Sequence, residues 1–147
     1  MNNYQRTAAW LHACGKEQTP HNVSIQIGCH IEEFVEFLDA IHVNIGADTK
    51  ASVMLALTDL AKGLKAGGIW YASIPLGRRV DALDALCDME VTGNGIAYLA
   101  DMEKDAADQA VIASNEAKLV DGKPVILPGG KIGKPEGWKP PNLTHYV

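Results

Sequence analysis

Two groups of acidic residues, each spaced like one face of a helix, constrain this chain more than any other feature. The groups are Glu32, Glu33, Glu36 and Asp39, and then Asp81, Asp84 and Asp88. At about 100° per residue, positions 32, 36 and 39 fall within roughly 60° of one another, as do the three in the second group. Two such faces in one helical bundle would repel unless positive charge lay between them. Mg²⁺ and Mn²⁺, which prefer oxygen ligands, meet that need.

The same pattern also has an ordinary explanation, since a surface helix carries a polar stripe opposite an apolar one. Apolar residues do accompany both groups: Ile31, Phe34, Leu38 and Ile41, then Val80, Leu83 and Cys87. However, the acidic pattern occurs twice, and no Lys or Arg lies between Lys16 and Lys50 to form i,i+4 pairs. A face selected only for solubility usually mixes charges of both signs, so a metal site is favoured.

Hydrophobic periodicity predicts a chain made mainly of helices. The expected helices cover residues 4–14, 23–45, 49–66, 78–101 and 103–119. We expect Asp48 to cap the third helix and Gly67 and Gly68 to end it. Its candidate core positions are Leu55, Leu57, Leu60 and Leu64. Gly93 and Gly95 weaken the fourth helix, which makes sense if another helix or a ligand approaches its backbone.

Composition narrows the classes of function. The 147 residues are enough for one domain with a single core. A net charge of −5 argues against binding to a nucleic-acid polymer. No apolar run approaches 18 residues, so we expect no membrane span. The three cysteines are odd in number and widely spaced, which indicates reduced thiols of a cytosolic protein.

The C-terminal segment differs from the rest of the chain. Residues 120–147 hold five Pro and five Gly, and the five Lys from Lys118 onward exceed the acids there by three. The segment cannot be helical, and we expect a short hairpin followed by an irregular arm. Its apolar residues favour an ordered arm over a disordered terminus. We therefore expect a helical domain over 1–119 and, as part of the same domain, a basic arm over 120–147.

The acidic motifs resemble those of a known superfamily. Glu32-Glu33-Phe-Val-Glu36, followed about fifty residues later by Asp84-Ala-Leu-Cys-Asp88, is similar to the EExxE and ExxD signature of the all-α nucleoside triphosphate pyrophosphohydrolases. This superfamily includes MazG, the dimeric dUTPases and phosphoribosyl-ATP pyrophosphohydrolase. The likeness to MazG-like proteins of phages and bacteria extends to Ala113-Ser-Asn115-Glu-Ala-Lys118-Leu and the tail after it, and covers roughly residues 4–143. In the second motif, either Asp81 or Asp84 replaces the Glu of the superfamily.

The resemblance implies an all-α bundle of four or five helices that hydrolyses a (deoxy)nucleoside triphosphate to the monophosphate and pyrophosphate. It assigns metal binding to Glu33, Glu36, Asp84 and Asp88. One of Glu32 and Glu33 would accept the proton of the attacking water. The expected substrate-binding residues are Asn94, Asn115, Lys118, Lys131 and Lys134. The resemblance further implies two or more Mg²⁺ per site, with Mn²⁺ as an alternative. It also implies a homodimer or homotetramer in the cytoplasm of a bacterium or of a phage-infected host.

Two other functions remain open at this stage. The chain could be a catalytically silent helical bundle that binds a regulatory partner, which a loss of divalent-metal binding would favour. It could also act on phosphoribosyl-ATP, which a dedicated basic pocket would favour. The sequence offers no sign of such a pocket.

Overall fold

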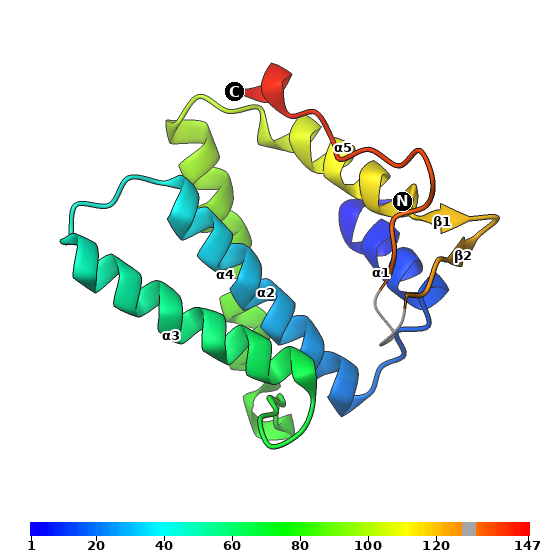
Figure 1. Cartoon of the computed structure of the whole chain (residues 1–147), viewed down its shortest axis with the longest axis horizontal. Coiled ribbons are helices and arrows are strands. Elements are labelled where there is room, and N and C mark those ends of the chain that lie inside the picture. Colours follow the sequence, from blue (N-terminus) through cyan, green and yellow to red (C-terminus); the bar gives the residue numbers. More distant parts are fainter. Residues whose placement is uncertain (128–131) are drawn as a thin grey trace. The chain divides into compact units, whose positions relative to one another are not determined.

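The computed structural model describes residues 1–127 and 132–147, and most of these residues are helical. The described helices and strands are α1 (Asn3–Ala13), α2 (Pro20–Ala40), α3 (Ala47–Ala66), η1 (Leu76–Arg78), α4 (Arg79–Leu99), α5 (Lys104–Glu116), β1 (Leu119–Val120), β2 (Lys123–Pro124) and η2 (Thr144–Tyr146). Figure 1 shows their order along the chain. The all-α class expected from the sequence is confirmed.

The chain divides into two compact units, which are described separately. One unit is Gln18–Leu76 and contains α2 and α3. The other combines Met1–Glu17 with Gly77–Val147, and so contains α1, α4, α5 and the C-terminal arm. In the described part of the chain, no helix is both long enough and apolar enough to cross a membrane.

The unit Gln18–Leu76 is a helical hairpin whose helices approach closely at a glycine. Thr19 caps α2 by accepting a hydrogen bond from Asn22 N, and Pro20 occupies its first turn. The two helices lie side by side (Figure 1). At Gly28, which is buried, an added Cβ would lie 2.8 Å from Lys65 Cγ and 2.9 Å from the Ala61 carbonyl oxygen. The backbones therefore meet at a distance that only glycine allows.

Several predicted details of this hairpin need correction. α2 ends at Ala40 rather than near Gly46, and Gly46 rather than Asp48 is the N-cap of α3. Gly67, at φ +62°, ends α3 as expected. Of the predicted core leucines, Leu64 is buried, but Leu55 and Leu60 are 64% and 39% exposed. The close approach at Gly28 instead buries small side chains, Ser24 and Ala61.

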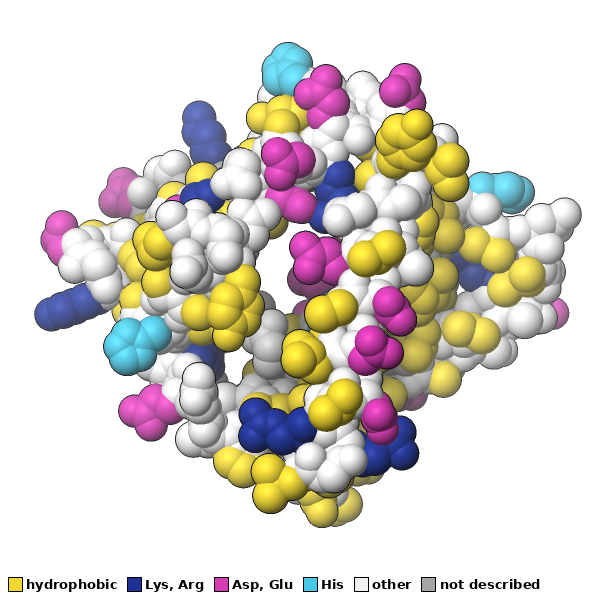
Figure 2. Space-filling model, turned by 180° about the vertical axis from the view of Figure 1, so that it is seen from behind, with side chains coloured by type: hydrophobic (Ala, Val, Ile, Leu, Met, Phe, Trp, Pro, Cys, Tyr) yellow, Lys and Arg dark blue, Asp and Glu magenta, His cyan; other side chains and the backbone are white. Residues whose placement is uncertain are grey.

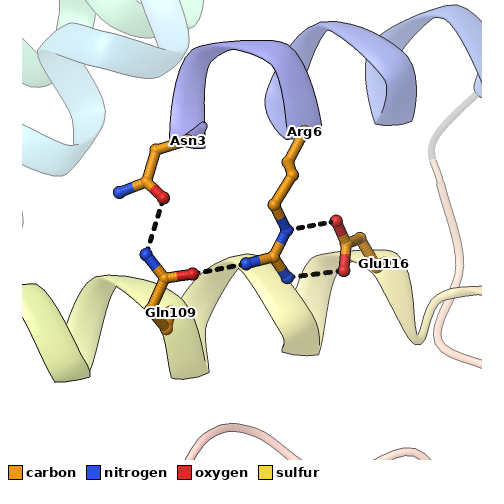
Figure 3. A network of polar contacts seen from close by, with 4 residues as sticks. All are labelled: Asn3, Arg6, Gln109 and Glu116. Atoms are coloured by element: carbon orange, nitrogen blue, oxygen red, sulfur yellow. Dashed lines mark hydrogen bonds and ion pairs between the residues drawn. The ribbon is translucent and has the colours of Figure 1, made fainter. Parts of the chain in front are cut away.

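In the second unit, a polar network joins α1 to α5. Arg6 donates from Nε and Nη2 to the two carboxylate oxygens of Glu116, at 2.8 and 2.7 Å, and also donates to Gln109. Gln109 in turn donates to Asn3 (Figure 3). The hydrogen bond from Arg6 lowers the pKa of Glu116, and the same contact raises that of Arg6. A planar guanidinium on a carboxylate fixes the orientation of two helices better than a single hydrogen bond does.

This bidentate pair predicts a pH-dependent change in stability. A carboxyl whose pKa is lowered by folding contributes stability above its ordinary pKa, and that contribution disappears as the pH falls through the folded pKa. We expect Glu116→Gln to lower the Tm at pH 7 by about 1–4 °C, the scale of an exposed pair. Melting curves recorded between pH 7 and pH 3 should show the two proteins converging at low pH. A Tm difference that persists unchanged at pH 3 would contradict this explanation.

The C-terminal arm returns along α5 (Figure 1). β1 and β2 form an antiparallel hairpin, as expected, and a bridge pairs Ile126 with Ile132. Farther on, Trp138 Nε1 donates to the Ser114 carbonyl at 2.9 Å, near the end of α5. Near the C-terminus, the Tyr146 carbonyl accepts from Glu103 N at 2.9 Å, at the start of α5. The arm is thus attached to both ends of one helix.

Helix α4 exposes most of its side chains. Of its 21 residues, all of which the structure describes, only Ala97 is buried, while Val80 and Tyr98 are 80% and 82% exposed. A Cβ added at Gly93 or Gly95 would have no atom of the described chain within 4 Å. Figure 2 shows a face of the molecule on which exposed hydrophobic and acidic side chains are intermixed. Helix α4 therefore leaves large apolar side chains in contact with solvent.

Candidate functional site

The first acidic group lies on α2 beyond the close approach at Gly28. Glu32 is half-buried and accepts a hydrogen bond from Lys65 Nζ of α3 at 2.5 Å. The aliphatic part of the Lys65 side chain packs against α2 at Gly28, one turn before Glu32. The glycine therefore makes room for the side chain whose ammonium neutralises Glu32. The role of Lys65 was not predicted, because no local sequence pattern connects it to a residue of the preceding helix.

Glu33 differs from its neighbours in its electrostatics. Although the residue is exposed as a whole, partial burial of its carboxyl raises its pKa. The charges of Glu36 and Glu32 raise the pKa further, and those of Lys65 and His30 oppose the change. Like charges at helical spacing therefore add to the effect of burial in disfavouring ionisation of Glu33.

The second acidic group lies on α4, in the other unit. Asp81, Asp84 and Asp88 are all exposed. The carboxylate of Asp81 pairs with Arg78 Nε at 2.8 Å. Asp81 is one of the two candidates for the position of the Glu in the superfamily motif. The assignment of Asp84 and Asp88 as metal ligands stays a prediction. That the two acidic groups meet remains a prediction.

The donors present fit a hard divalent cation in their chemistry, because carboxylate oxygens are the ligands that Mg²⁺ and Mn²⁺ prefer. Among the described residues, however, no three side chains of His, Cys, Asp or Glu converge so as to hold a metal ion. Glu32, Glu33 and Glu36 follow one another along a helix without closing around a common point. The assignment of the metal ligands therefore rests on residue chemistry and spacing.

Three of the predicted substrate-binding residues come together around Trp138. Lys118 Nζ lies 5.4 Å and Lys134 Nζ 4.6 Å from the centre of the Trp138 ring. Lys118 also donates to Asn115 Oδ1 at 2.8 Å and lies 5.9 Å from the centre of the Trp10 ring. The third predicted lysine, at position 131, falls outside the described ranges 1–127 and 132–147.

Asn94 lies elsewhere, in an open cleft of about 530 Å³ within the same unit. The lining comes from α1, α4 and α5 and includes Glu90, Asn94, Tyr98, Met102 and Lys104. Lys104 is paired with Asp108 across the first turn of α5, at 2.6 Å. Asp84 and Asp88 are not among the lining residues. The structure thus separates Asn94 from the predicted phosphate-binding residues.

Comparison of the whole chain with protein-family models, with curated proteins and with solved structures finds no match.

Proposed function

We propose that the chain is a metal-dependent nucleoside triphosphate pyrophosphohydrolase with the helical bundle of that superfamily. The observation that carries the proposal is the pair of acidic groups at helical spacing. The raised pKa of Glu33 supports it, because it reflects partial burial of this carboxyl and, in addition, the nearby charges of Glu36 and Glu32. Like charges held close together lower the stability of the fold, and such arrangements are typical of functional sites.

The reaction follows from the residues assigned. In this proposal, the carboxylates of Glu33 and Glu36 on α2 would bind divalent ions, and so would those of Asp84 and Asp88 on α4. Mg²⁺ or Mn²⁺, when bound, would polarise the phosphoryl oxygens and lower the pKa of a coordinated water. The water oxygen forms a bond to the α-phosphorus, and the bond from that phosphorus to the bridging oxygen breaks. Pyrophosphate leaves with the bond's electrons, and a carboxylate accepts the proton of the water.

Two details of the site support particular roles. Glu32 is already engaged by Lys65, which leaves Glu33 as the candidate for accepting the proton of the attacking water. We assign proton abstraction to Glu33. Asn115, Lys118 and Lys134 bind phosphate oxygens in this proposal, and Asn94 binds the base or the sugar.

A screen of the eight common (d)NTPs, each with Mg²⁺ and with Mn²⁺, tests the proposal. Release of both pyrophosphate and the monophosphate is expected for at least one nucleotide, and neither should form in EDTA. Release of orthophosphate instead would indicate cleavage at another bond. Absence of turnover with every nucleotide and both metals would refute the proposal.

A second candidate is a catalytically silent bundle that binds a protein partner. The exposed apolar side chains of α4 favour it, as does the lack of a converging metal-ligand group among the described residues. The two candidates differ in metal binding: the enzyme binds Mn²⁺ through its carboxylates, and the silent bundle does not.

We also expect the chain to form a homodimer or homotetramer. The physical reason is the apolar surface of α4, together with that of Ile69, Tyr71 and Leu76 before it, which are 95%, 77% and 83% exposed. Burial of such surface drives association. Light scattering at micromolar concentration should give at least twice the monomer mass of 15.8 kDa. A monomer under these conditions would show that this surface has another role.

A further inference from the structure

Trp138 is held firmly to the end of α5. Its indole N–H donates to the Ser114 carbonyl, and its backbone N–H closes a turn onto the Pro135 carbonyl at 3.1 Å. Gly137 lies in that turn at φ +76°, a conformation that favours glycine. The ring is half-buried, so one part packs on the unit and another stays accessible. Both the position and the orientation of the ring are thereby determined.

Two ammonium groups approach this one ring from different segments. Lys118 comes from the residues after α5 and Lys134 from the arm. Since their distances from the ring centre are 5.4 and 4.6 Å, the two nitrogens are at most 10 Å apart. Asn115 joins the group through its hydrogen bond with Lys118. Trp138 is thus the side chain that both lysines approach.

The electrostatics of this arrangement point to an anion. Two like charges near each other repel, and the π-face of an indole offsets part of that repulsion by attracting each cation. A polyphosphate offers several charged oxygens and accepts hydrogen bonds from ammonium and amide donors alike.

We propose that Trp138 is a positioning residue that gathers Asn115, Lys118 and Lys134 into a binding group for the phosphates of a di- or triphosphate. The identity of this ligand rests on the function proposed above. The geometry of the group does not, since it is built entirely within one unit. Trp138 acts through the two lysines and need not touch the substrate itself.

Binding of inorganic pyrophosphate in EDTA tests the inference without metal and without turnover. Isothermal titration of the full chain should show that Trp138→Leu weakens binding about tenfold, the loss expected when two cation–π contacts disappear. Trp138→Phe retains a π-face and should lose less. Lys134→Met, at an exposed position, should weaken binding by a similar factor with little risk to folding. Tryptophan fluorescence of the wild type should change on pyrophosphate binding, and the change should be lost in Trp138→Phe.

Trp70→Phe provides the matched control. Trp70 packs on Gly63 and lies in the unit that contains α2 and α3. This variant should bind pyrophosphate as the wild type does and retain the fluorescence change. If NTP hydrolysis is found, Trp138→Leu should raise KM about tenfold and leave kcat within about twofold, which a general loss of structure would not do.

The outcomes separate this inference from the proposed function. If pyrophosphate binding depends on Trp138 but no nucleotide is hydrolysed, the inference stands and the enzymatic function fails. If nucleotides are hydrolysed while Trp138→Leu and Lys134→Met bind pyrophosphate unchanged, Trp138 only anchors the arm and the inference is overturned. A wild-type protein that binds no pyrophosphate also overturns it.

Discussion

Glu36→Gln is expected to lower kcat at least about 100-fold while the far-ultraviolet circular dichroism spectrum stays helical. In the proposed site, Glu36 is a direct ligand of a divalent ion. Substitution of a residue that only hydrogen-bonds to a metal ligand typically lowers metal affinity or activity 10- to 100-fold, so loss of a direct ligand should lower it at least as much. Gln keeps the size of the side chain but removes the charge that binds the ion. A titration of Mn²⁺ should show correspondingly weaker binding.

The same substitution removes a source of repulsion on α2, since the charge of Glu36 raises the pKa of Glu33. The Tm of Glu36→Gln should therefore be equal to or higher than that of the wild type, as expected for a site that sacrifices stability. Asp39→Asn is the matched control, because it makes the same change of charge one turn later on the same helix. Its turnover should stay within about twofold of the wild type. If Glu36→Gln retains activity, the assignment of the ligands is wrong.

Gly28→Ala should destabilise the chain by about 1–3 kcal/mol, the usual effect of overpacking a close contact. The added methyl would meet the Ala61 carbonyl oxygen at 2.9 Å and Leu64 Cβ at 3.1 Å, and backbone cannot move aside as a flexible side chain can. It would also displace the Lys65 stem from its path to Glu32. Thermal and urea unfolding measure the change.

Gly93→Ala is the control for Gly28→Ala, since both glycines lie inside long helices. No described atom lies within 4 Å of the methyl that this substitution adds. Only the higher helix propensity of Ala should then affect stability, and the free energy of unfolding should rise by about 1 kcal/mol. Destabilisation of Gly93→Ala would instead reveal a partner packed against α4 in solution.

The helices were largely predictable because local patterns encode them. All five were expected from hydrophobic periodicity, and Gly67 marked the end of α3 as a positive-φ glycine should. Their boundaries were less accurate: α2 stops five residues before the predicted residue 45, at Ala40. A helix end is a competition between local hydrogen bonds and the path that the chain must take next, and the second factor is not local.

The buried positions were harder to predict than the helices. Periodicity favoured the large apolar residues of α3, but the structure exposes Leu55 and Leu60 and buries Ala61 at the close approach to Gly28. Which stripe of a helix becomes the core depends on which face meets a neighbour. Where Gly28 lets the backbones meet, Ala61 and Leu64 fill the contact, and Leu55 and Leu60 lie outside it.

For the candidate site, the sequence by itself determined which carboxylates share a helix face, because spacing along a helix places them there whatever the rest of the chain does. It also indicated the basic, proline-rich arm. Only the tertiary structure decided that Lys65 reaches Glu32 across Gly28, and that Lys118 and Lys134 meet at Trp138. These contacts join residues that are far apart in the chain, and their formation depends on how helices and arm pack. Local propensity contains no information about that packing, which is determined by how well the side chains of different elements fit together.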